Sequence, residues 1–161
     1  MSTIDGLPAH VLLVHLLVVF GPLTGALLVV CGVWPAARRR LVWLVAASAI
    51  VIAALTPLTV DAGEWLQDRL GASPDVHAHA RLGDTMIYIS AGLMVGAFLV
   101  VALHVSDRRA ESPRTVLTVI VAIVAITVGV ASIVQVYRIG ESGARAAWAD
   151  QISIVTPSVM P

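Results

Sequence analysis

The chain has 161 residues, of which 58% are hydrophobic and only 12% are charged. Soluble domains carry about 25% charged residues, so this composition excludes an ordinary soluble domain. The ten basic and ten acidic residues balance to a formal net charge of zero, which argues against nucleic acid as a partner. The lone Cys31 excludes a disulfide framework and a Cys-based zinc site.

Four apolar runs are each long enough to cross a membrane as a helix. At about 1.5 Å of rise per residue, roughly 20 residues span a hydrocarbon core of about 30 Å. The runs cover residues 11–34, 41–60, 85–105 and 115–137. They predict an all-α integral membrane protein, a four-helix bundle that occupies residues 1–161 as a single domain.

The first helix is expected to start at Pro8, because proline suits the first turn of a helix. Within this run, Gly21 and Gly25 have the GxxxG spacing that favours close helix packing in lipid. The same glycines could instead let a flat porphyrin approach the helix. Both interpretations stay open at this stage.

The third helix has a clear start signal in Ser73-Pro74-Asp75. Serine is a good N-cap, proline suits the first helical position, and the acid lies next to the positive end of the helix dipole. We therefore expect a helix from about Pro74 to Val105, with its first two turns above the membrane.

The arginines predict the orientation of the bundle. Six of the ten lie between the first and second runs or between the third and fourth: Arg38, Arg39, Arg40, Arg108, Arg109 and Arg114. The positive-inside rule places these two connections in the cytoplasm. The N-terminus and the C-terminus are therefore both predicted to lie outside, on the side of the membrane away from the cytoplasm.

Four of the five histidines lie near the outer ends of the first and third runs: His10, His15, His77 and His79. An ionisable residue at membrane depth is a functional hypothesis by default, because its burial in hydrocarbon is costly. Helical phase places His79 on the same side as Met86, whereas His77 falls on a polar stripe. His15 and His79 are the first candidates to face inward, followed by His10 and then His77. The fifth, His104, lies at the cytoplasmic end and is predicted to have no ligand role.

Two imidazoles on facing helices can ligate a b-type haem from both sides. The predicted cofactor-binding residues are His10, His15, His79, Gly21 and Gly25. Convergence of more histidines with carboxylates would instead suit Zn or Cu, and the metal candidates are His10, His15, His77 and His79. Gln135 is predicted to line the same outer cavity. No catalytic residue is predicted, because no nucleophile elbow, phosphate loop or zinc-protease motif is present.

Three stretches carry a family resemblance: Gly6–His15 with its His-x4-His spacing, Thr56–Leu66 followed by His77–Asp84, and Val136–Ala144. They resemble a bacterial membrane family catalogued as domain of unknown function 2231. The resemblance implies a layout similar to that of four-helix, b-haem membrane cytochromes, with family-like histidines at His10, His15 and His79. The chain departs from the family at Glu141, where a histidine is common, and lacks the prolines that usually follow the first two histidines.

Three functions follow as hypotheses. The first is electron transfer by a b-type haem at the outer end, between a quinone or another redox subunit and an external acceptor. The second is a non-catalytic subunit that packs, through its glycine faces, into a larger membrane complex or a homo-oligomer. The third is a Zn or Cu site at the outer face.

Overall fold

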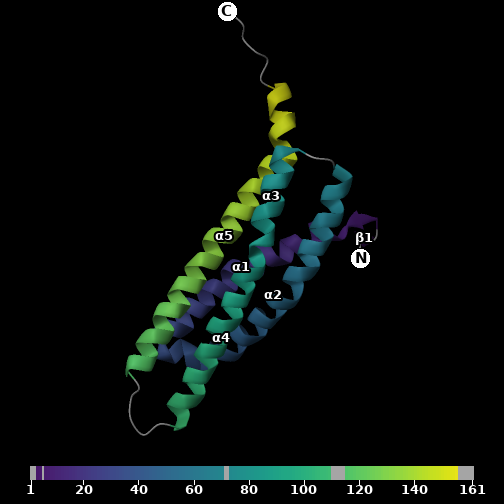
Figure 1. Cartoon of the computed structure of the whole chain (residues 1–161). Coiled ribbons are helices and arrows are strands. Elements are labelled where there is room, and N and C mark those ends of the chain that lie inside the picture. The colour runs from purple at the N-terminus through teal and green to yellow at the C-terminus, as the bar shows by residue number, and fades with distance from the viewer. Residues whose placement is uncertain (1–2, 5, 71–72, 110–114, 156–161) are drawn as a thin grey trace, which may run out of the picture.

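The computed structural model describes residues 3–4, 6–70, 73–109 and 115–155. Five helices dominate the fold (Figure 1). In chain order the elements are β1 (Thr3–Ile4), β2 (Leu7–Pro8), α1 (Ala9–Val33), α2 (Pro35–Leu70), α3 (Pro74–Asp84), α4 (Met86–Arg109) and α5 (Thr115–Val155). The two short strands pair antiparallel across Gly6, whose φ of +81° lies in the left-handed region that glycine adopts without strain.

The predicted all-α fold with four long apolar helices is confirmed. The stretches long and apolar enough to cross a membrane are Ala9–Val33, Pro35–Arg69, Pro74–Arg109 and Thr115–Trp148. The third comprises α3 and α4 together, which follow one another alongside α5 in Figure 1. Four such helices suggest a multi-pass membrane protein.

The third helical stretch runs from Pro74 to Arg109, with one interruption at Thr85. Thr85 separates α3 from α4, and its hydroxyl donates a hydrogen bond of 2.6 Å to the carbonyl of Leu82. The side-chain amide of Gln135 on α5 donates to the Thr85 hydroxyl at 2.6 Å and to the Leu82 carbonyl at 3.3 Å. Gln135 therefore binds the break between α3 and α4 and does not line the outer cavity as predicted.

Other helix ends follow local signals to different degrees. Ser73 is the N-cap of α3 as predicted, since its hydroxyl accepts a hydrogen bond of 3.2 Å from the backbone N–H of Val76. Pro8 lies at the N-cap of α1, one residue before the helix that it was expected to open. Helices α2 and α5 also continue well past the apolar runs, to Leu70 and Val155.

The helices pack through small residues and a continuous apolar core. Helix α1 lies between α2 and α5, and α4 closes the bundle against the same two helices. A Cβ built on Gly25 of α1 would lie 2.7 Å from the carbonyl oxygen of Gly129 on α5, so only glycine permits this approach. Leu28, Ile52 and Leu93 are fully buried between the helices.

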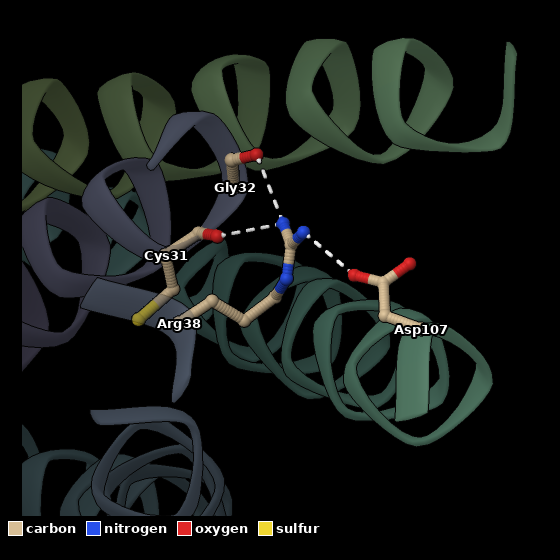
Figure 2. A network of polar contacts seen from close by, with 4 residues as sticks. All are labelled: Cys31, Gly32, Arg38 and Asp107. Carbon is tan, nitrogen blue, oxygen red and sulfur yellow. Dashed lines mark hydrogen bonds and ion pairs between the residues drawn. The ribbon is translucent and has the colours of Figure 1, made fainter. Parts of the chain in front are cut away.

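The segment 35–40, predicted to be a connecting loop, already belongs to α2, and only Trp34 separates α1 from α2. Arg38 is buried there with 2% of its surface exposed. Its guanidinium donates to the carbonyl oxygens of Cys31 at 3.2 Å and Gly32 at 3.5 Å, and to the carboxylate of Asp107 at 2.9 Å (Figure 2). Arg38 thereby joins the end of α1, the start of α2 and the end of α4. Arg114, which contributed to the predicted orientation, lies outside the described residues.

Candidate outer-end site

A cavity of about 490 Å³ lies at the end of the bundle that the sequence predicts to face outward. All the helices contribute to it, and α4 does so only through Met86. On α2 the lining runs from Thr56 to Gln67, which at about 1.5 Å per residue makes the cavity roughly 16 Å deep. Its walls are almost entirely apolar, so it is suited to a flat or elongated apolar molecule.

Unequal helix lengths and small side chains create this cavity. Helix α1 has 25 residues, whereas α2 has 36 and α5 has 41, so α2 and α5 extend beyond the start of α1 (Figure 1). On the cavity side, α3 and α5 also carry several small residues: Ala80, Gly83, Gly140, Gly143, Ala146 and Ala147. Because these residues fill little volume, space remains open between the helices.

Two histidines from different helices meet in this cavity. The ring centroids of His10 on α1 and His79 on α3 lie 6.2 Å apart, and the ring planes are inclined by 82°. Both side chains are half-buried and both line the cavity. The inward orientation predicted for His79 is therefore seen, but its neighbour is His10 and not His15.

Each of the two imidazoles has one nitrogen engaged by a hydrogen bond. Nδ1 of His10 lies 2.9 Å from the carbonyl oxygen of Thr59, and this oxygen can only accept. Nδ1 of His79 lies 3.0 Å from the hydroxyl of Ser142, which itself donates to the carbonyl of Ile139 at 2.9 Å. Nδ1 of His10 must therefore carry the proton, and Nδ1 of His79 carries it when the Ser142 hydroxyl donates to Ile139.

In neutral imidazoles of this tautomer, Nε2 carries the lone pair. Among the residues that the structure describes, neither Nε2 has a hydrogen-bond partner. Metal-ligating histidines commonly donate their second ring N–H to a carbonyl or a similar acceptor, which fixes the tautomer and the ring orientation. His10 and His79 meet this requirement.

Two glycines set the positions of the rings. A Cβ built on Gly63 of α2 would lie 3.0 Å from Cε1 of His10, and one built on Gly143 of α5 would lie 3.0 Å from Cε1 of His79. These separations are shorter than ordinary van der Waals contact, so any side chain would displace the ring. Each imidazole is thus positioned by a hydrogen bond at Nδ1 and by contact with a helix surface where glycine leaves no side chain.

The remaining candidates lie elsewhere. His15 is exposed at the edge of the cavity and its Nδ1 bonds to the carbonyl of Val11 on its own helix. His77 is exposed, with Nδ1 2.9 Å from the amide nitrogen of Gln67. His104 is buried at the opposite end of the bundle, with 4% of its surface exposed.

Gly21 and Gly25 face α5 and do not line the cavity. A Cβ on Gly21 would lie 3.1 Å from a methyl of Val136, and the Gly21 carbonyl accepts a hydrogen bond of 3.1 Å from Ser132. Together with the Gly25 contact to Gly129, this accounts for both glycines by helix packing.

The four predicted metal ligands do not converge in the described part of the chain. No group of three or more His, Cys, Asp or Glu side chains that could hold a metal ion occurs among these residues. Glu64 and Asp84 line the cavity but are exposed. The arrangement brings together two imidazoles, whereas a structural zinc site takes four ligands.

The sequence analysis missed Thr59, Ser142, Gly63 and Gly143, which orient the two histidines. In the sequence, these residues lie inside two of the three stretches that carry the family resemblance. Thr59 and Gly63 belong to Thr56–Leu66, and Ser142 and Gly143 belong to Val136–Ala144. Comparison of the chain with family models, curated proteins and solved structures gave no match.

Proposed function

We propose that this chain is a multi-pass protein of the bacterial inner membrane that binds a b-type haem between His10 and His79 and transfers electrons at its outer end. One observation carries the proposal: two imidazoles from separate helices line one apolar cavity with their ring centroids 6.2 Å apart, each with Nδ1 engaged and, among the described residues, no hydrogen-bond partner at Nε2. The resemblance to domain of unknown function 2231 points in the same direction.

The separation of the rings fits a shared iron. A metal ion bound by one nitrogen of each imidazole at about 2.0–2.1 Å leaves the two ring centroids at most about 6.4 Å apart. The observed 6.2 Å is close to this limit.

The cavity also fits a porphyrin. A Cβ built on Gly83 or on Gly140 would meet no atom within 4 Å, so both glycines border open space that a flat ring could occupy. No arginine occurs among the described lining residues, so the haem carboxylates would have to reach water at the outer opening.

The chain itself supplies orientation and a dry environment. The Thr59 carbonyl and the Ser142 hydroxyl hold His10 and His79 in the tautomer that presents Nε2, which makes the pair ready to bind without rearrangement. Apolar walls exclude water from the inner part of the site. A haem ligated by two imidazoles supplies reversible one-electron transfer, with a potential set by its ligands and surroundings. A quinone or another redox subunit would be the partner in the membrane.

The direct test is a reduced-minus-oxidised absorption spectrum of the detergent-purified protein, with haem content per chain measured on the same sample. We expect the sharp bands of a b-type haem, and we expect them to disappear in His10→Ala and in His79→Ala. His77→Ala is the matched control, because His77 is an exposed histidine of the same helix as His79 and its side chain bonds to Gln67 outside the site. His15→Ala should also keep the bands.

Bands that survive in the double variant of His10 and His79 would exclude this ligand pair. A colourless wild-type protein that takes up no added haem would refute the proposal altogether. In that case a non-catalytic subunit becomes the better hypothesis, and co-purification of a partner would be the next measurement.

A further inference from the structure

Four exposed arginines form one surface at the end of the bundle opposite the histidine cavity. We call it the arginine surface: Arg39 and Arg40 in the first turns of α2, and Arg108 and Arg109 in the last turn of α4. None of the four forms an ion pair with any residue in the described ranges. The surface thus carries four positive charges that nothing described in the fold neutralises.

The buried pair of Arg38 and Asp107 brings the two halves of this surface together. Asp107 precedes Arg108 and Arg38 precedes Arg39, so their bond of 2.9 Å places α2 and α4 side by side at this point (Figure 2). The positive charges of Arg39 and of Arg108 both act on the imidazole of His104. The pairing also engages Asp107, so its carboxylate does not offset the neighbouring arginines.

Helix stability does not account for this placement. Arg108 and Arg109 complement the negative end of α4, whereas Arg39 and Arg40, in the second turn of α2, gain nothing from its dipole. No acid occurs in the first turn of α2 to compensate. The exposed indoles of Trp34 and Trp43 flank the same end, as aromatic residues do at a membrane interface.

We propose that the arginine surface binds the phosphate groups of anionic phospholipids. Guanidinium groups bind phosphate through paired, charge-assisted hydrogen bonds. Adjacent apolar helix surface and two tryptophans suit the acyl chains and glycerol region of a lipid. This site is separate from the haem site and does not depend on it.

The test is native mass spectrometry of the detergent-solubilised protein with phosphatidylglycerol or phosphatidylcholine added. Each basic residue near an anionic membrane surface strengthens binding about five-fold, so four give on the order of 10²–10³-fold preference for the anionic lipid. Replacement of Arg39, Arg40, Arg108 and Arg109 by Gln should remove this preference. Arg81→Gln with Arg145→Gln is the control, because both arginines are exposed at the opposite end.

A preference that survives the fourfold replacement, or that the control pair reduces equally, would overturn the proposal. Inorganic phosphate at the same concentration should not displace the lipid, and displacement would show that the surface binds free phosphate instead. Circular dichroism of each variant should match the wild type. If the fourfold variant does not fold, the two pairs of substitutions tested separately should each lower the preference by more than ten-fold.

Discussion

Arg38 and Asp107 form an ion pair of 2.9 Å in which the two partners differ sharply in exposure: the side chain of Arg38 is 3% exposed and that of Asp107 is 38% exposed. The buried guanidinium also binds two carbonyl oxygens at the C-terminal end of α1. The pair therefore acts as a cap for α1 and as a bond between α2 and α4, and its two members should not be equally sensitive to substitution.

We expect Arg38→Ala to lower the free energy of unfolding by about 3 kcal/mol, because it removes three hydrogen bonds at a buried position. Asp107→Asn should cost less, about 1–2 kcal/mol, because the amide oxygen can still accept from Arg38. Thermal or denaturant unfolding in detergent measures both. Arg145→Ala, which removes an exposed pair with Glu141 on α5, is the control and should cost about 0.3–0.5 kcal/mol. Equal losses for Arg38→Ala and Arg145→Ala would contradict a capping role.

The contact between Gly25 and Gly129 predicts strong sensitivity at one glycine and tolerance at another. In Gly25→Ala the new methyl would meet backbone, which cannot move aside, so α1 and α5 must separate at a cost of about 1–3 kcal/mol. In Gly92→Ala the methyl would meet only the Val128 side chain, at 3.5 Å, and the better helix propensity of alanine should leave stability unchanged or slightly raised. The midpoints of thermal unfolding compare the two variants. A stable Gly25→Ala protein would mean that the helices are less closely packed than described.

Gly143 on α5 lines the cavity, Gly92 on α4 does not, and alanine at the two positions should affect haem binding differently. Gly143→Ala pushes a methyl against the His79 ring, so we expect loss of most haem binding with the fold retained. Gly92→Ala lies outside the cavity and its methyl would meet only the Val128 side chain, so haem binding should continue and the helix should be as stable or slightly more so. Haem content per chain and the unfolding midpoint report the two effects. Equal haem content in both variants would show that the position of the His79 ring is not critical.

Ser142 acts on His79 as a positioning residue. Ser142→Ala removes the acceptor for the Nδ1 proton of His79, and losses of this kind lower metal affinity about 10–100-fold. The reduction potential should shift as well, since the ligand loses its fixed orientation. Ser142→Thr retains the hydroxyl and should restore both values. Titration with haem and redox potentiometry give the measurements, with Glu141→Ala as a neighbouring control. A normal potential in Ser142→Ala would rule out this role.

Much of the fold could be read from local patterns in the sequence. The four apolar runs predicted the four long helices, because hydropathy and length are properties of each segment alone. The Ser73 cap was predictable for the same reason, since an N-cap depends on residues within one turn. The break at Thr85 was not predictable, because the bond that stabilises it comes from Gln135, far along the chain.

The histidine pair needed the tertiary structure. Helical phase identified the inward side of α3 and hence His79, but phase within one helix says nothing about the relative heights of two helices. His10 and not His15 meets His79 because of where α1 begins beside the longer α2 and α5. Arg38 illustrates the same limit. In the sequence, Arg38 is one of three consecutive arginines that carry the same charge. The packing of α1, α2 and α4 buries Arg38 and leaves Arg39 and Arg40 exposed. Composition and periodicity thus determined which segments form helices and which residue types lie at each end. The heights, contacts and burial that make a site were decided by packing between helices, because those energies depend on neighbours that are distant in sequence.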